Sequence, residues 1–198
     1  YSAAISACDK GAMWQDALHA FSDMLRRVLE PNVVSYSAAI AACATGAVWD
    51  GALGLISAMR QRVVEPNVIT YNAAILACER GARVNDAVAM FSDMHRRVVE
   101  PDLYSHTLAV RAYELSSQWH DALNTFSNMR QHVVDPDEMA YGAAISACRQ
   151  GAQAQMALHL MSEMRQRDLE CNADIFKAVI DAKMSFHRCT VSARVLAG

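Results

Sequence analysis

Apolar residues recur at spacings of three and four along the chain, in stretches that alternate with short polar breaks. Between residues 33 and 67 a first stripe contains Val33, Tyr36, Ala39, Ile40 and Cys43, and a second contains Trp49, Ala52, Leu53, Ile56 and Met59. Side chains at such spacings share one face of a helix, so each stripe predicts an amphipathic helix. The pattern therefore predicts a two-helix hairpin.

The residues between the stripes indicate where these helices begin and end. Gly46 is expected to end the first helix in the left-handed conformation that glycine favours at helix C-termini. Arg60 and Arg62 lie near the end of the second helix, where cations interact favourably with the helix dipole. Pro66 then breaks the chain, and Asn67 is expected to cap the next helix.

The hairpin pattern repeats every 35 residues without insertion or deletion. This register holds proline at Pro31, Pro66, Pro101 and Pro136; methionine at Met24, Met59, Met94, Met129 and Met164; alanine at Ala17, Ala52, Ala87, Ala122 and Ala157; tyrosine at Tyr1, Tyr36, Tyr71 and Tyr141, with His106 in the gap; and glycine at Gly11, Gly46, Gly81 and Gly151, with Ser116 substituting once. A fixed period of this length is the sequence signature of a repeat protein. The repeats cover residues 1–32 (partial), 33–67, 68–102, 103–137, 138–172 and 173–198 (truncated and divergent).

Helical hairpins of this length stack on their neighbours and bury a continuous core, so the predicted fold class is an all-α solenoid forming one continuous domain. Alanines such as Ala38 and Ala39 on the predicted first helices allow them to approach closely. This explains how the chain reaches 53% hydrophobic residues with only 7% aromatic ones. In the final repeat Cys171 replaces proline and Phe186 replaces glycine, a divergence that fits either a capping repeat at a solenoid end or a decaying repeat.

Charge and terminal sequence exclude several classes of protein. The formal net charge of −3 argues against a generic polyanion binder, which would carry a strong basic excess. No basic segment followed by an apolar block opens the sequence, so we expect no secretory signal within it. The chain begins at Tyr1, inside a repeat, so we expect it to be part of a longer protein. The uncharged window from Pro31 to Trp49 contains Asn32 and Gly46 and is not a membrane span.

No pattern of catalytic or metal-binding residues emerges. Cys8, Cys43, Cys78 and Cys148 recur at one register position in separate hairpins, too far apart for disulfides, and are expected to be buried and reduced. No spacing typical of zinc ligands, catalytic triads or phosphate-binding loops is present. The recurring Trp14, Trp49 and Trp119 are expected to be core residues. The sequence therefore predicts neither an enzyme nor a cofactor, and no small-molecule substrate.

Half of the basic residues form one recurring band at the ends of the second helices. The band consists of Arg26, Arg27, Arg60, Arg62, Arg96, Arg97, Arg130, Arg165 and Arg167. Two interpretations stay open: complementation of the helix dipole together with solubility, or an arginine stripe that follows a phosphate backbone.

The 35-residue period, with repeats that open with segments such as NVVSYSAAIAAC and close with proline plus Asn or Asp, resembles the pentatricopeptide repeat family in its pure 35-residue form. The resemblance extends from the partial first hairpin to at least residue 172. It implies a right-handed α-solenoid of stacked helix-turn-helix repeats. It also implies a protein that binds single-stranded RNA in a plastid or mitochondrion, one base per repeat, in RNA processing.

The resemblance further implies which residues contact RNA. The base readers would be the pairs Ser2 with Asn32, Ser37 with Asn67, Asn72 with Asp102, Thr107 with Asp137, and Gly142 with Asn172, for an RNA of about 5′-AAUG(A)-3′. Val34, Ile69, Tyr104 and Met139 would lie between successive bases, and Lys10 and Arg80 would contact phosphate. The chemistry agrees: an Asn amide can both donate to and accept from adenine, whereas an Asp carboxylate only accepts, which suits the N–H groups of guanine and uracil.

Two departures from the family pattern keep other functions open. The phosphate-contacting register holds Lys10, Thr45, Arg80, Leu115 and Gln150, so only two of five are basic, which predicts modest affinity and a shallow salt dependence. The closing Asn or Asp can equally serve as a helix cap. The alternative function is a structural α-solenoid that docks on a large organellar protein complex, such as a ribosome or membrane complex. Peptide binding of the tetratricopeptide type is a further alternative.

Overall fold

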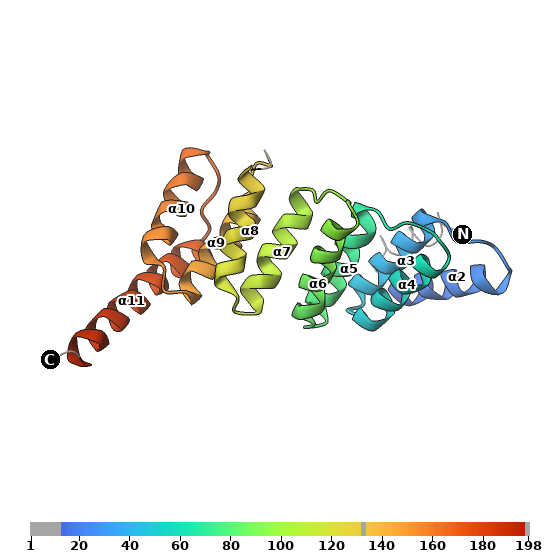
Figure 1. Ribbon diagram of the computed structural model, residues 1–198, viewed down its shortest axis with the longest axis horizontal. Helices are drawn as coiled ribbons and strands as arrows, with labels where there is room; N and C mark the ends of the chain where they lie inside the picture. The colour runs from blue at the N-terminus through green and yellow to red at the C-terminus, as the bar shows by residue number, and fades with distance from the viewer. Residues whose placement is uncertain (1–12, 132–133, 197–198) are drawn as a thin grey trace. The chain divides into compact units, whose positions relative to one another are not determined.

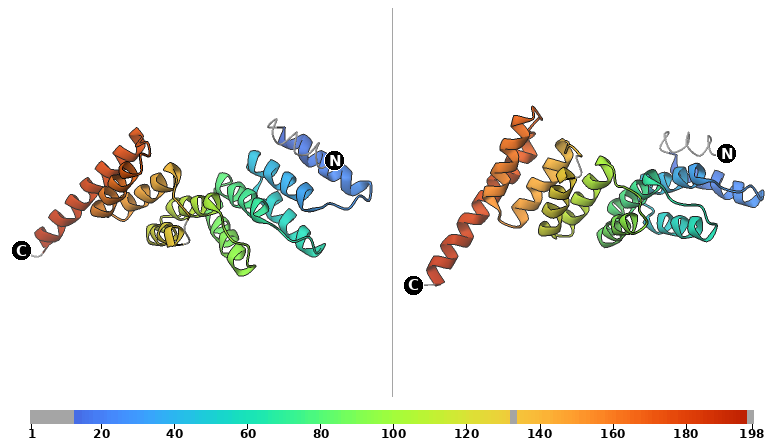
Figure 2. Two further views of the ribbon diagram at one scale, coloured as in Figure 1. Left: turned by 90° about the horizontal axis from the view of Figure 1, so that it is seen from above. Right: turned by 45° about the horizontal axis from the view of Figure 1, so that its top comes forward.

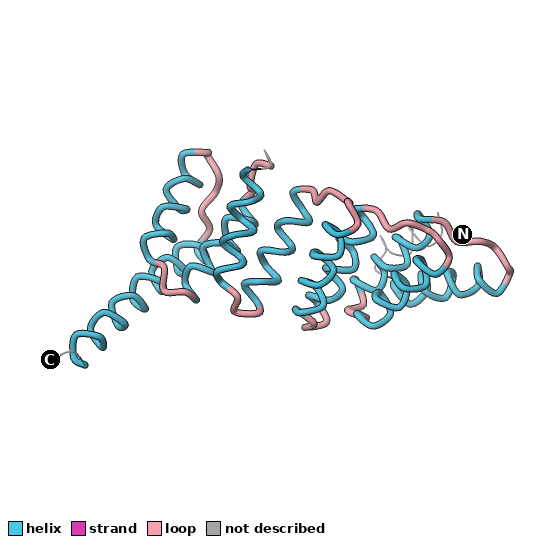
Figure 3. Tube along the Cα trace, viewed as in Figure 1, coloured by secondary structure: helices cyan, strands magenta, loops and turns pink. Residues whose placement is uncertain are grey.

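The computed structural model describes residues 13–131 and 134–196, with side chains as far as residue 185. Within these residues every regular element is a helix (Figures 1 and 3). The first helices of the repeats are α3 (Val33–Thr45), α5 (Val68–Arg80), α7 (Leu103–Leu115), α9 (Glu138–Gln150) and α11 (Ala173–Leu196); the second helices are α2 (Trp14–Arg26), α4 (Trp49–Gln61), α6 (Val84–Arg96), α8 (Trp119–Gln131) and α10 (Ala154–Gln166). The predicted all-α repeat solenoid is confirmed.

The chain divides into two compact units, residues 1–105 and 106–198. In the described part of the first unit, α3 packs against α2, α4 and α5, and α5 packs against α4 and α6 (Figure 2). In the second unit, α9 packs against α8, α10 and α11. The helices α3, α5 and α9 are therefore each enclosed by their own hairpin partner and by helices of neighbouring repeats.

Small side chains line the contacts between these helices. Ala39, Ala74 and Ala144 are completely buried at one register position, and each is followed by a buried isoleucine. In the first unit, Tyr36 packs with Phe21 of α2 in a cluster that also contains Met59 of α4. The expected core of alanines with few large side chains is thus present.

The expectation that Gly46 adopts the left-handed conformation was wrong. Its φ is −87°, and the left-handed residue is the next one, Ala47, with φ 54°. Gly46 is needed for space instead, because a Cβ there would lie 2.8 Å from Cε2 of Trp14. The same close approach recurs between Gly81 and Trp49 and between Gly151 and Trp119. The tryptophans pack against helix ends one repeat later.

The loops after the second helices contain left-handed valines. Val28, Val63 and Val98 have φ between 56° and 58° and are almost fully exposed. A β-branched residue is strained in this conformation because its Cβ crowds the backbone. Glycine, which lacks a Cβ, adopts it without this strain.

Replacing Val63 by glycine is therefore expected to raise the free energy of unfolding by about 0.5–1 kcal/mol, since relief of strain exceeds the added entropy of the unfolded chain. Urea denaturation of the purified protein measures the change. Val63→Ala removes the β-branch but keeps the Cβ and should gain less. A Val63→Gly protein that is less stable than the parent would show that the valine side chain stabilises this loop.

In the described part of the chain, no helix is both long and apolar enough to cross a membrane.

Candidate nucleic-acid interface

The Asn and Asp residues that close the repeats all cap the helix that follows. In each case Oδ1 of the capping side chain accepts from the backbone N–H three residues later. The donors and acceptors are Ser35 to Asn32 (3.0 Å), Thr70 to Asn67 (3.0 Å), Ser105 to Asp102 (2.8 Å), Ala140 to Asp137 (2.8 Å) and Ile175 to Asn172 (3.0 Å). The cap role is thus confirmed. Each backbone bond goes to Oδ1, so capping itself does not use the second polar atom of the side chain.

In the repeat 68–102 the two proposed base readers touch. The amide nitrogen Nδ2 of Asn72 donates to Asp102 Oδ1 at 3.1 Å, and Ser105 Oγ lies 2.6 Å from Asn72 Oδ1. Asn72 is buried, whereas Asp102 is exposed at the end of its loop. The pKa of Asp102 is below its usual value: burial would raise it, but the hydrogen bonds from Ser105 and Asn72 outweigh that effect. This repeat therefore presents an ionised carboxylate next to an oriented amide.

In the repeat 33–67 the pair is joined through a third residue. Ser37 Oγ lies 2.8 Å from the hydroxyl of Thr70, which donates to Asn67 Oδ1 at 2.9 Å. Since Thr70 N–H also donates to this oxygen, both of its lone pairs are occupied. Asn67 would then contact adenine through its N–H groups alone, rather than through both amide atoms as its chemistry first suggests.

The remaining pairs differ. Ser2 and Lys10 lie outside the described residues. In the repeat 103–137, Thr107 is buried and Asp137 is half-buried, and the following helix offers Ala140 instead of a hydroxyl. In the repeat 138–172, Gly142 and Asn172 line a hollow of about 490 Å³.

This hollow lies within the second compact unit. Its walls are formed by Met139, Gly142, Asn172, Ile175 and neighbouring polar residues, among them Arg111, Glu114, Glu138 and Asp174. Its volume is in the range of ordinary small-ligand sites. The missing side chain of Gly142 contributes to the space, since a Cβ there would still be 3.9 Å from Ile175.

The four residues expected to lie between bases are exposed apolar side chains. Val34, Ile69, Tyr104 and Met139 occupy the second position of their helices, and their exposed fractions run from 43% for Tyr104 to 65% for Ile69. The tyrosines two positions later, Tyr36, Tyr71 and Tyr141, are buried. Each first helix from α3 to α9 thus presents one apolar side chain to solvent beside its capping residue.

Arg80, expected to contact phosphate, is engaged within the protein. Its Nη1 donates to the carbonyl oxygen of Ala44 at 3.0 Å, at the end of the preceding first helix. Gln150, in the same register, donates to the carbonyl oxygen of Glu114 at 2.8 Å. Arg80 and Gln150 therefore satisfy carbonyl groups at helix C-termini one repeat earlier, a role that their register alone did not indicate.

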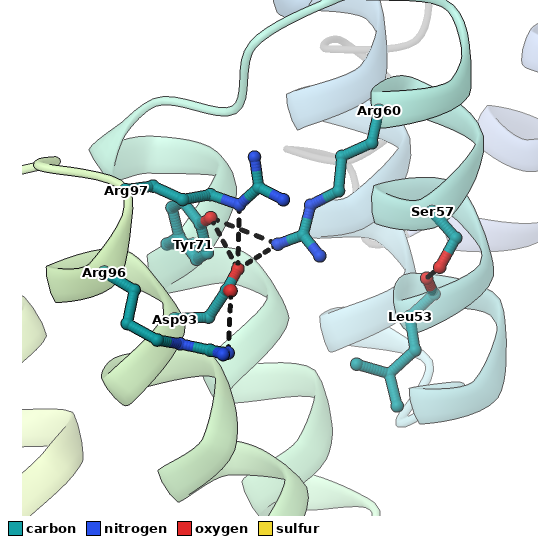
Figure 4. Close-up of polar contacts among 7 residues, drawn as sticks. All are labelled: Leu53, Ser57, Arg60, Tyr71, Asp93, Arg96 and Arg97. Carbon is teal, nitrogen blue, oxygen red and sulfur yellow. Dashed lines mark hydrogen bonds and ion pairs between the residues drawn. The ribbon is translucent and has the colours of Figure 1, made fainter.

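The arginine band is largely paired with carboxylates. Asp93 of α6 forms ion pairs with Arg60 of α4, with Arg96 at 2.9 Å and with Arg97 at 3.4 Å (Figure 4). The hydroxyl of Tyr71 also donates a hydrogen bond to the Asp93 carboxylate at 2.8 Å. Further pairs join Arg26 with Asp23, Arg130 with Glu163, and Arg167 with Asp135 and Glu163. These pairs favour a structural role for the band over a phosphate-binding stripe.

Three of the four recurring cysteines are core residues, and Cys8 lies outside the described residues. Cys43, Cys78 and Cys148 are buried and carry free thiols. Burial raises their pKa to about 11, 11 and 12, so they stay protonated and unreactive at neutral pH. Across the described residues, no group of three or more His, Cys, Asp and Glu side chains is placed to hold a metal ion.

Two models of repeat families match parts of the sequence. A model of the PPR repeat family matches residues 66–114, and a model of the pentatricopeptide repeat domain matches residues 19–80. No curated protein sequence matches the chain.

Solved structures share the fold. The chain is similar to the pentatricopeptide repeat protein PPR10 in complex with an 18-nt psaJ RNA element, with a TM-score of 0.67 and 22% identity over 96% of this chain and 28% of that one. It is also similar to the PPR domain of Arabidopsis thaliana protein-only RNase P 1 in complex with tRNA, with a TM-score of 0.77 and 14% identity over 91% of this chain and 95% of that one. The chain thus spans little more than a quarter of PPR10.

Proposed function

Because this chain is a pentatricopeptide repeat protein, we propose that it binds single-stranded RNA sequence-selectively, each repeat reading one base. The observation that carries the proposal is the contact between Asn72 and Asp102, flanked along the first helices by the exposed side chains of Ile69 and Tyr104. This combines oriented hydrogen-bonding groups with apolar surfaces on which a base can rest. The neighbours PPR10 and protein-only RNase P 1 were solved with RNA bound, which supports the same class of ligand.

The proposed target is 5′-AAUG(A)-3′, bound in an organellar RNA-processing role. Asn72 with Asp102 would read uracil as the third base, and Thr107 with Asp137 would read guanine as the fourth. Tyr104, the aromatic member of the four exposed residues, would contribute about 1–3 kcal/mol of stacking. The repeats themselves would act as a binding surface and carry no catalytic step.

The alternative is a scaffold that docks on a large organellar complex through protein contacts. The acidic groups of Glu114, Glu138 and Asp174 beside the hollow of the second unit favour it, because they repel a polyanion. For RNA binding, the same groups imply modest affinity and a shallow dependence on salt.

Fluorescence anisotropy distinguishes the two functions. The protein is titrated into labelled RNA containing AAUGA, a shuffled sequence, and a duplex of the first. Selective binding to AAUGA that weakens with salt supports base reading. Equal or absent binding at low salt contradicts it and points to the scaffold.

Asp137→Asn tests one reader directly. The amide keeps an oxygen that can accept from Ala140 N–H, so the cap is retained, but it adds an N–H donor where the carboxylate only accepts. The preference at the fourth base is expected to shift from guanine toward adenine by about tenfold, the size of one good base contact.

Competition anisotropy with AAUGA and AAUAA measures this shift, and circular dichroism checks helicity. Asp135→Asn, two residues earlier and 94% exposed in its side chain, is the matched control and should leave the ratio unchanged. A lower melting temperature without any change in the ratio would identify Asp137 as a cap alone.

A further inference from the structure

In two of the proposed reader pairs, a buried hydroxyl contributed by the following repeat links the two members of the pair. Ser105, the third residue of α7, is fully buried; its Oγ lies 2.6 Å from Asn72 Oδ1 and 2.8 Å from Asp102 Oδ1, and it accepts from Asp102 N–H at 3.2 Å. All three residues lie in the first compact unit. The hydroxyl therefore contacts both members of the pair in the repeat 68–102.

Thr70 holds the same place one repeat earlier. It is fully buried, and its hydroxyl links Ser37 (2.8 Å) to Asn67 (2.9 Å). The next two repeats lack this link, because the register position holds Ala140 and then Ile175. The hydroxyl is thus a feature of particular repeats rather than a requirement of capping, since Asp137 and Asn172 are capped without it.

In the repeat 68–102 the contacts with Asp102 and Ser105 together fix which way the Asn72 amide faces. An amide has two N–H groups and an oxygen with two lone pairs. One N–H goes to Asp102, which as a carboxylate can only accept, and one lone pair faces the Ser105 hydroxyl, whose single proton serves Asn72 Oδ1 at 2.6 Å and Asp102 Oδ1 at 2.8 Å in turn. A rotation of the amide by 180° would place the amide oxygen against the carboxylate, which is repulsive, and would also lose the bond from the Ser105 hydroxyl to Asn72 Oδ1, so both neighbours favour the same orientation.

The order of donor and acceptor decides between the two pyrimidines. Uracil presents a carbonyl acceptor beside its ring N–H donor, whereas cytosine presents an amino donor beside a ring acceptor. One orientation of the remaining N–H and lone pair of Asn72 fits uracil, and the opposite orientation fits cytosine. A fixed amide therefore discriminates, and an amide that rotates accepts both.

We propose that Ser105 is a positioning residue for base selection, which acts together with Asp102 to hold the Asn72 amide in the orientation that selects uracil over cytosine, and that Thr70 likewise positions Ser37 and Asn67. This inference rests on the proposed RNA binding. It adds a third residue, contributed by the next repeat, to the two that would contact the base.

The test compares Ser105→Ala with the parent protein and with Ser105→Thr, which restores a hydroxyl. Anisotropy gives the dissociation constants for AAUGA and AACGA, and for AAUAA as an internal reference at the fourth base. We expect Ser105→Ala to lower the uracil-over-cytosine ratio at least fivefold, Ser105→Thr to restore most of it, and the guanine-over-adenine ratio at the fourth base to stay constant. A purely structural loss would weaken all RNAs alike.

The outcomes separate the two levels of the proposal. If the parent protein shows no selectivity for AAUGA, the proposed function fails and this inference with it. If the parent discriminates uracil from cytosine and Ser105→Ala discriminates equally well, RNA reading stands and the positioning role is overturned. If Ser105→Ala does not fold, Thr70→Ala gives the answer at the second base: unchanged selectivity for adenine there overturns the inference, and reduced selectivity supports it.

Discussion

Replacing Gly81 by serine is expected to lower the free energy of unfolding by about 2–3 kcal/mol. In a protein that already carries Trp49→Val, the same Gly81→Ser substitution is expected to cost much less, because the clashing side chain is gone. A Cβ at Gly81 would lie 2.9 Å from both Cβ and Cγ of Trp49. Because the Trp49 Cβ is attached directly to its backbone, rotation of the ring cannot relieve the clash. The backbone is no obstacle, since Gly81 has φ −81°, which any residue adopts.

One repeat of this chain already has valine in place of the tryptophan and serine in place of the glycine. Tracing the two register positions one repeat apart gives Trp14 with Gly46, Trp49 with Gly81, Val84 with Ser116, Trp119 with Gly151, and Ala154 with Phe186. Every tryptophan is followed by glycine, and wherever the tryptophan is replaced, the glycine is replaced as well. Valine with serine is thus a pair that this protein already uses.

A double-mutant cycle in urea measures the coupling. Trp49→Val alone should cost about 2–4 kcal/mol through lost burial, and the interaction energy between the two sites should reach about 2 kcal/mol. Gly54→Ser is the control, because a Cβ at Gly54 meets no atom within 4 Å. A Gly81→Ser protein as stable as the Gly54→Ser protein would show that the tryptophan moves aside freely.

These pairs also show what the sequence could and could not predict. The period of 35 residues and the apolar spacing predicted the helices α3 and α4, because both follow from local geometry. The role of Gly46 was misinterpreted, because glycine suits a left-handed turn and a close approach equally well. The sequence did contain one signal that distinguishes them: the glycine varies together with a tryptophan one repeat away.

The candidate site was also predictable only in part. The position of Asn72 and Asp102 in the family's repeat pattern indicated that they act as a pair, and the structure brings them into contact. The hydroxyl of Ser105 could not be foreseen, because its bond to Asn72 joins residues 33 positions apart, which only the stacking of hairpins brings together. Arg80 was assigned to phosphate from its charge and its register in the family resemblance, whereas its contact with Ala44 depends on the stacking of hairpins.

A second pair of register positions carries charge between repeats. One repeat apart, the residues are Leu25 with Ala58, Arg60 with Asp93, His95 with Asn128, and Arg130 with Glu163. Where the first position holds an apolar residue, the second is apolar as well, and where the first holds arginine, the second holds a carboxylate. Two of these pairs, Arg60 with Asp93 and Arg130 with Glu163, form ion pairs in the structure.

Replacing Asp93 by asparagine is expected to lower the free energy of unfolding by about 2 kcal/mol, because three guanidinium groups and Tyr71 would then face a neutral side chain. The loss is below that of a fully buried pair, since Arg60, Arg96 and Arg97 retain access to water. Asp93→Ala should cost less in an Arg60→Leu background, which approaches the natural pair Leu25 with Ala58. Equal costs in both backgrounds would contradict a specific pairing.

Acid should remove this stabilisation in the parent protein. Burial would raise the pKa of Asp93, but the Tyr71 hydrogen bond and the charges of Arg60, Arg97 and Arg96 outweigh it and hold the pKa below the usual 3.8. A carboxylate with a lowered folded-state pKa stabilises fully above its unfolded pKa and loses that contribution as pH falls through the folded value. The stability difference between the parent and Asp93→Asn should therefore be constant from about pH 5 to 7 and shrink below about pH 4. Urea titrations at several pH values measure this difference, and Asp135→Asn, an exposed carboxylate, should show little of it. A difference that persists undiminished at pH 2 would mean that the Asp93 charge contributes nothing to stability.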